Sequence, residues 1–301
     1  DEQLSDNDVL MMLPDHKLKD AFLARDTKVH WLLTILAAAA FFAFLVALST
    51  DGSAKPASLL LVGLFTSTVG IVFLFVVRAI AEWTQGVIFV PHSLGGLVIW
   101  AIQLIGLSYR VALDPRSDLV TSFLGFTFGV GLCEEIVKVI PVLLNHYRHG
   151  DRTWRGAYLW GLASGAGFGL AEGIIYAADF YNGVSGFGIY FVRDISCVAL
   201  HAIWAGSAAI MIHQKQHWFQ DSESWLDFLF RVLLVVAVPM VLHGLYDTLL
   251  KKEMNAGALG VAVLSFGYLA FLISRLRGDD DQAANKKLLS EYSKRRRAMG
   301  V

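Results

Sequence analysis

Long apolar runs are the feature that most constrains how this chain can fold. Eight segments of about twenty largely apolar residues follow one another, and pairs such as Asp-Gly, Asp-Pro and Asn-Gly stand between several of them. A helix of about twenty residues crosses the hydrocarbon core of a bilayer, and open sheets are excluded there because their backbone groups would lack partners. We therefore predict transmembrane helices at residues 31–48, 59–81, 94–113, 119–144, 156–181, 190–213, 228–250 and 256–276.

The composition agrees with a membrane protein. Of the 301 residues, 55% are hydrophobic and 17% are charged, and the mean hydropathy is +0.54. In a soluble domain about 25% of the residues are charged. The sequence thus predicts an all-α fold, a polytopic membrane helix bundle of about eight transmembrane helices. The expected divisions are a cytosolic N-terminal arm at 1–29, a transmembrane domain at 30–277 and a basic cytosolic tail at 278–301.

Basic residues in the connecting segments set the expected orientation. Lys and Arg gather before the first span, between the fourth and fifth spans, between the sixth and seventh, and in the C-terminal tail. Cytoplasmic loops carry such an excess of basic residues. With eight spans these segments all share one side, so we predict an integral membrane protein with both termini in the cytoplasm. Its surroundings are the lipid bilayer, and no nucleic-acid partner is expected.

The fourth span contains three charged residues that a membrane segment normally lacks, Glu134, Glu135 and Lys138. Each costs at least about 2.5 kcal/mol at the centre of a membrane helix, so the group needs a bundle interior and partners. Glu134 and Lys138 are four residues apart, which predicts a helical ion pair. Glu135 lies about 100° further around the helix and is expected to stay free to exchange protons.

The fifth span carries an acid beside a stripe of small residues. The stripe consists of Gly161, Gly165, Gly169 and Gly173, which are spaced four apart. Such a stripe lets a neighbouring helix approach closely, and by itself it is typical of ordinary helix packing. Close packing against the fourth span would bring Glu172 near the two acids of that span.

The sixth and seventh spans add imidazoles. His201 lies in the sixth, and His243 and Asp247 lie one helical turn apart in the seventh. A lone membrane histidine usually serves as a hydrogen-bonding residue between helices, and Asp247 can satisfy His243. Four consecutive spans that each offer an acid or an imidazole favour chemistry instead, because ionisable groups inside a membrane mark functional sites. Helices four to seven therefore form the predicted core.

Together the four spans carry Glu134-Glu135-x-x-Lys138, Phe168-x-x-x-Glu172, His201 and His243-x-x-x-Asp247. This series resembles the PrsW family of bacterial intramembrane proteases, which shares a superfamily with the CAAX prenyl endopeptidases and the Abi/CPBP membrane proteases. The resemblance covers about residues 119–250 and implies a location in the bacterial cytoplasmic membrane.

The resemblance implies peptide hydrolysis, with 30–277 as a protease-like domain. The implied substrate is a membrane-anchored protein, for which an anti-sigma factor is one candidate, and the oligomeric state stays open. The implied catalytic residues are Glu134, Glu135, Glu172, His201 and His243. The implied supporting residues are Lys138, Phe168 and Asp247.

Two chemistries fit these residue types. In the metal-free one, which we favour, one of the paired glutamates acts with Glu172 to deprotonate a water, and a histidine stabilises the oxyanion. Lys138 then keeps the adjacent acid ionised, and Asp247 fixes the tautomer of His243. In the alternative, zinc is bound with an open position for water. Its ligands would be Glu135, Glu172, His201 and His243. The chain has no His-Glu-x-x-His motif, so local spacing does not favour zinc.

Two further functions compete with proteolysis. Intramembrane Glu, His and Asp residues also build proton relays in transporters, although no inverted repeat is evident here. A family member that binds its partner without cutting it is the third hypothesis.

Overall fold

The computed structural model describes the backbone of residues 25–84, 93–149, 153–179 and 187–298. Within these ranges it places the side chains of 31–84, 93, 95–146, 153–175 and 196–278. Most of the predicted N-terminal arm, residues 1–24, lies outside the described residues. Every regular element in the described ranges is helical, which confirms the all-α class.

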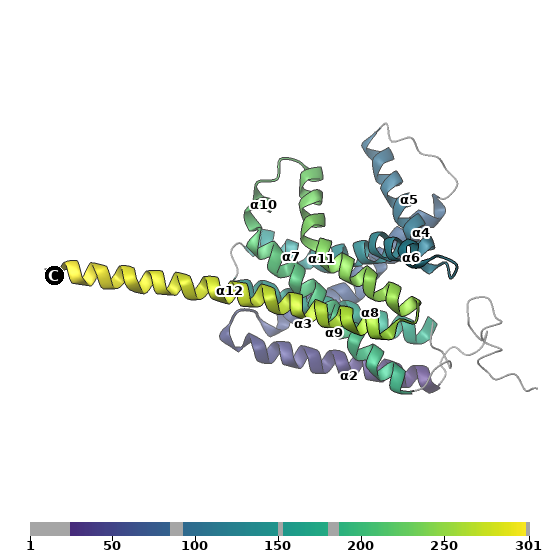
Figure 1. The fold of residues 1–301 in the computed structure, drawn as a ribbon, viewed down its shortest axis with the longest axis horizontal. Coiled ribbons are helices and arrows are strands. Elements are labelled where there is room, and N and C mark those ends of the chain that lie inside the picture. Colours follow the sequence, from purple (N-terminus) through teal and green to yellow (C-terminus); the bar gives the residue numbers. More distant parts are fainter. Residues whose placement is uncertain (1–24, 85–92, 150–152, 180–186, 299–301) are drawn as a thin grey trace, which may run out of the picture.

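Each predicted span corresponds to a helix or to a continuous series of helical segments (Figure 1). The elements are α2 (Arg25–Leu48), η2 (Ser49–Asp51), α3 (Pro56–Phe65), η3 (Thr66–Gly70), α4 (Ile71–Trp83), α5 (Leu94–Leu113), α6 (Leu119–Gly125), η4 (Phe126–Gly131), α7 (Leu132–His149), α8 (Trp154–Asp179), α9 (Phe187–Gln214), α10 (Gln216–Gln220), α11 (Trp225–Lys251) and α12 (Asn255–Ala298). α12 continues past the predicted end of the last span and through most of the predicted tail.

Six of these helical segments are long and apolar enough to cross a membrane. They correspond to the predicted spans one, two, three, six, seven and eight. The remaining two, 119–149 and Trp154–Asp179, carry the charged residues and the glycine stripe. The polytopic membrane class is therefore confirmed, and eight remains the predicted number of spans.

The glycine stripe of α8 serves mainly to bring α9 close. A Cβ atom on Gly161 would lie 2.5 Å from the carbonyl oxygen of Ala205, and one on Gly169 would lie 2.8 Å from that of Cys197. Such distances exclude any side chain, so glycine is required where the two backbones meet. The stripe was expected to pack against the fourth span. In the structure it faces α9, whose backbone at Cys197, His201 and Ala205 lies directly against the glycines.

The start of α7 packs against α11 in the same way. A Cβ atom on Gly131 would lie 2.8 Å from the carbonyl oxygen of Met240, and Gly244 faces Thr127 without room for a side chain. Gly131 is the last residue of η4, a π-type turn, and such turns occur frequently at functional sites. This contact places the first turn of α7, with its two glutamates, opposite the histidine of α11.

Contacts at the two ends of the bundle reveal the path of the chain. At one end the guanidinium of Arg155 donates a 3.2 Å hydrogen bond to Asp51, so the η2 turn after α2 meets the first turn of α8. At the other end Lys251 donates to the carbonyl oxygens of Ala112 and Asp114, each at 2.6 Å. The 31 residues of α6, η4 and α7 separate the two ends by about 46 Å, at 1.5 Å per residue.

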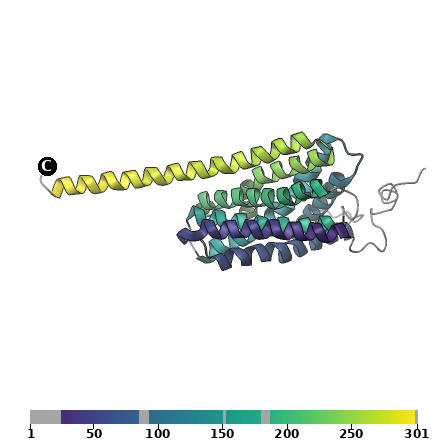
Figure 2. The same cartoon turned by 90° about the horizontal axis from the view of Figure 1, so that it is seen from below.

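This path differs from the one that the predicted orientation assumes, in which all consecutive spans cross in turn. Three predicted spans lie between Asp51 and Arg155, and three complete crossings would place these residues on opposite sides. α5 does not follow the bundle axis, because Figure 1 shows it at a steep angle to α2, α8, α9 and α12. As a result α2 begins and α12 ends at opposite ends of the bundle (Figure 2).

Cysteine labelling distinguishes the two topologies. Cys133 and Cys197 are first replaced by Ser, and single cysteines are introduced at exposed positions as Thr50→Cys, Thr153→Cys and Arg116→Cys. We expect a membrane-impermeant maleimide to label the first two from the same side of oriented vesicles and the third from the other side. Labelling of Thr50→Cys and Arg116→Cys from one side, with Thr153→Cys on the other, would restore the sequence-based topology.

Candidate functional site

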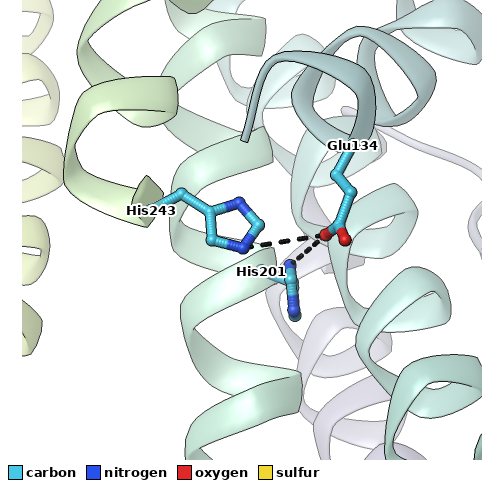
Figure 3. Close-up of side chains that lie close together, drawn as sticks. All are labelled: Glu134, His201 and His243. Atoms are coloured by element: carbon cyan, nitrogen blue, oxygen red, sulfur yellow. Dashed lines mark ion pairs between the residues drawn. The ribbon is translucent and has the colours of Figure 1, made fainter. Parts of the chain in front are cut away.

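Three of the predicted residues converge from separate helices. Figure 3 shows Glu134 of α7 pointing toward His201 of α9 and His243 of α11. The Glu134 Oε2 atom lies 3.7 Å from Nε2 of His243 and 4.0 Å from Nδ1 of His201. All three side chains are buried. Residues more than one hundred positions apart in the sequence thus share one interior site.

Lys138 supplies the positive charge at the centre of this cluster. Its Nζ atom is fully buried and lies 2.7 Å from Oε1 of Glu135, compared with 3.6 Å from Oε2 of Glu134. The structure therefore pairs Lys138 with Glu135, the acid that we predicted from the sequence to stay free. The ammonium also lies 4.5 Å from the centre of the Phe168 ring, which is a favourable cation–π position.

Glu135 is held by two donors. Its Oε1 atom accepts a hydrogen bond from Lys138 and another, at 2.9 Å, from Nδ1 of His243. Because Nδ1 donates, Nε2 of His243 is the nitrogen that faces the site. It lies 3.3 Å from Oδ2 of Asp247, one helical turn further along α11. Glu135 and Asp247 therefore fix the ring of His243 from both sides.

His201 is oriented by a second acid. Its Nδ1 atom accepts a 2.5 Å hydrogen bond from Lys138, so the ring proton is on Nε2, which donates to Oε2 of Glu172. Glu172 also accepts a weak hydrogen bond from the thiol of Cys197, with 3.5 Å between sulfur and oxygen. Glu172 therefore belongs to the same site, although the stripe beside it packs against a different helix from the one expected.

The two adjacent glutamates differ in how they are satisfied. Within the described residues, Oε2 of Glu134 and Oε2 of Glu135 are both buried without a hydrogen-bond partner. Burying an unsatisfied polar atom costs about 1–3 kcal/mol, and more when it is charged. Glu135 is compensated at its other oxygen by two donors, whereas Oε2 of Glu134 faces two imidazoles at slightly more than hydrogen-bond distance. Glu134 is therefore the acid whose unpaired oxygen faces both imidazoles.

Sequence reasoning missed the residues that hold the histidines in place. The ring of Trp204 stacks on His243, with 4.4 Å between centroids, and meets His201 edge-on at 5.5 Å. Its Nε1 atom donates a 3.0 Å hydrogen bond to Ser265 of α12. Trp204 lies three residues after His201 and so shares its helix face, which was an available signal. Ser265 carried no such signal, because its partner lies on another helix.

A cavity of about 190 Å³ adjoins this cluster. Glu134 of α7 and Glu172 of α8 face it together with mostly apolar side chains from α4, α5, η4 and α8. Its lining residues are Ile71, Leu74, Phe75, Arg78, Tyr109, Leu113, Phe126, Val130, Glu134, Phe168, Glu172 and Ile175. Two carboxylates of the cluster are thus accessible to a molecule that occupies this space.

The donor set fits a divalent metal in type and in spacing. The ligand atoms of Glu134, His201 and His243 lie within 4.8 Å of one another. In a tetrahedral site with bonds of about 2.0–2.1 Å, ligand atoms stand roughly 3.3 Å apart, close to the 3.7 and 4.0 Å measured from Glu134. Each imidazole also has a carboxylate on its far nitrogen, as metal-binding histidines commonly do. Lys138 occupies Nδ1 of His201, however, so this nitrogen would have to exchange the lysine for the ion.

A second group of possible ligands adjoins the first. It consists of Glu172, Cys197 and His201, again with ligand atoms within 4.8 Å of one another. The predicted zinc set of Glu135, Glu172, His201 and His243 does not match either group among the described residues. Glu135 differs because its Oε1 atom is already engaged by Lys138 and His243.

The Lys138–Glu135 pair makes a testable contribution to stability. We expect Lys138→Met to lower the free energy of unfolding by about 3–5 kcal/mol, because it leaves Glu135 as an uncompensated buried charge. The double variant Lys138→Met/Glu135→Gln should recover part of this loss, since the second substitution removes that charge. The free energy of unfolding would be measured in the same detergent for the parent protein and for both variants. A single variant as stable as the parent protein would contradict the pairing.

Comparison with known proteins identifies the family to which this chain belongs. The model of the PrsW family of intramembrane metalloproteases matches residues 84–274, which include every helix that contributes to the cluster of acids and imidazoles. No curated protein and no solved structure matches the chain. The match extends over more than half of the sequence and includes residues 119–250, over which the resemblance was seen. The chain belongs to the PrsW family of intramembrane metalloproteases.

Proposed function

We propose that this protein is an endopeptidase that hydrolyses a peptide bond of a membrane-anchored protein inside the bundle. The observation that carries the proposal is the buried Oε2 atom of Glu134, which lacks a hydrogen bond, faces two imidazoles and belongs to a side chain that lines a cavity. Family membership favours peptide hydrolysis over the transporter hypothesis. An anti-sigma factor with a single membrane span is one substrate of this class.

Glu134 is the proposed general base. Its carboxylate, which lines the cavity, takes a proton from a water there, and Glu172, which lines the same cavity, orients that water. Glu135 has a different role, because its Oε1 atom already accepts from Lys138 and His243. It stabilises the lysine charge and orients the histidine. The structure thus supports different roles for two residues that are adjacent in the sequence.

His243, when it is protonated on both ring nitrogens, is the proposed donor to the oxyanion and to the leaving amine. His201 has a supporting role, because its Nδ1 accepts from Lys138 and its Nε2 donates to Glu172. Nε2 of His243 faces the site because its Nδ1 donates to Glu135, and Trp204 restricts rotation of the ring by stacking on it. A fixed donor stabilises developing negative charge without reorganisation, which is the main advantage of a preorganised site. Asp247 can carry the counter-charge when His243 holds a proton.

Metal-dependent hydrolysis is a second candidate, which the family description and the donor geometry favour. Glu134, His201 and His243 would hold the ion, with Glu135 and Glu172 behind the imidazoles. When bound, such an ion would polarise the scissile carbonyl or a bound water. The metal-free chemistry is supported by Lys138, whose ammonium already occupies Nδ1 of His201.

The role of Glu134 is tested by Glu134→Gln, which keeps the size of the side chain and removes the base. We expect kcat to fall by about 10²- to 10⁴-fold, the usual contribution of a general base. Cleavage of a reconstituted single-span substrate would be followed by mass spectrometry. Glu223→Gln, at an exposed acid outside the cluster, serves as the matched control and should cleave normally. A folded Glu134→Gln protein with full activity would refute the assignment.

Metal removal separates the two chemistries. The purified protein would be treated with a chelator, its metal content measured by mass spectrometry, and its activity assayed before and after zinc is added back. With the metal-free chemistry, we expect activity to persist when the sample contains far less than one metal ion per chain. Loss of activity that zinc restores would assign the reaction to the metalloprotease chemistry. Cobalt spectra of the parent protein and of His243→Ala would then identify the ligand independently of activity.

A further inference from the structure

The cavity next to Glu134 has a wall that the family match does not include. Ile71, Leu74, Phe75 and Arg78 of α4 line it, and all four precede residue 84, where the match begins. The opposite side is formed by α7 and α8, which carry Glu134 and Glu172. The acids of the core thus face a surface contributed by the more N-terminal part of this chain.

The cavity opens at the outside of the bundle. Phe75 and Leu113 line it, yet their side chains are 53% and 50% exposed on the outer surface. The neighbouring outer residues of α4 are also apolar, as Val72, Phe73 and Val76 show. In a membrane protein such a surface contacts lipid tails, so a substrate segment within the bilayer can reach the cavity past Phe75 and Leu113.

The size and lining of the cavity define the kind of side chain that fits. An engineered apolar cavity of about 150 Å³ admits benzene, so about 190 Å³ accommodates a side chain as large as Leu or Phe. Most of the wall is aliphatic or aromatic, and burying a charged group against it would be strongly unfavourable. Arg78 stands half exposed, and its charge is paired with Glu82 at 2.9 Å. It therefore offers little attraction to an acidic side chain.

We propose that this cavity is a specificity subsite that binds one large apolar side chain of the substrate, next to the bond that is cut. The proposal rests on the proposed function, because the position of Glu134 and Glu172 at the cavity is what places the occupant beside the scissile bond. α4 then determines which sequences are cleaved, while α7, α9 and α11 perform the reaction.

The test uses synthetic single-span peptides in liposomes, identical except for one central residue, which is Ala, Leu, Phe or Asp. Products are mapped by mass spectrometry. We expect the parent protein to cut beside Leu or Phe at least about 10-fold more efficiently than beside Ala, since a few methylene groups in an apolar pocket give differences of this order. The Asp peptide should be the poorest substrate.

Leu74→Trp fills the cavity, and Val72→Trp, at a 60% exposed position of the same helix, is the matched control. We expect Leu74→Trp to lose at least about 10-fold in kcat/KM for the Leu and Phe peptides while it still cuts the Ala peptide. Val72→Trp should keep the preference of the parent protein. Leu74→Ala, which enlarges the space, should shift the preference toward Phe and provides a second variant if the tryptophan prevents folding.

Several outcomes would overturn the proposal. One is a parent protein that cuts the Ala, Leu and Asp peptides equally. Another is a Leu74→Trp protein that retains the preference for Leu and Phe. A third is a Leu74→Trp protein whose cleavage of all four peptides falls by the same factor, while cleavage by Val72→Trp does not fall. Failure of the folded parent protein to cut any peptide would refute the proposed function itself, and the subsite with it.

Discussion

The ion pair between Lys138 and Glu135 is the interaction on which the rest of the site depends. Taking a charged group out of water costs several kcal/mol, even after the surroundings relax, and only well-placed partners offset this cost. Lys138 finds Glu135 at 2.7 Å, His201 at 2.5 Å and the face of Phe168 at 4.5 Å. These partners come from α7, α9 and α8. The lysine charge therefore requires three helices to meet at one depth.

That meeting is possible only because small residues line the contacts. Gly161 and Gly169 let α8 approach the backbone of α9, and Gly131 and Gly244 do the same for η4 and α11. In a membrane, helices gain little from hydrophobic association, so close van der Waals packing and interhelical hydrogen bonds must supply the attraction. The glycines and the polar cluster thus depend on each other. The glycines allow the helices to approach one another. The polar cluster places complementary groups on the helices that meet.

Much of the site was predictable because charged residues are rare in apolar segments. Glu134, Glu135, Glu172, His201 and His243 were all identified from that rarity, and the structure places them together. The pairing of Lys138 was not predictable, because residues three and four positions away are both within its reach on a helix. The choice depends on His243, which donates to the same oxygen of Glu135. The contact between Trp204 and Ser265 was also not predictable, because it joins residues of two different helices, α9 and α12.

The sequence by itself determined that the chain is a membrane helix bundle, and it identified the acids and imidazoles of the candidate site. It did so because the bilayer imposes local rules, so that any segment of about twenty apolar residues becomes a helix and any charge within it is exceptional. The tertiary structure alone decided which acid pairs with the lysine, that Asp51 meets Arg155 and that α4 forms a wall of the cavity. These features depend on helix directions and on contacts between distant segments, and no local pattern of residues specifies either one.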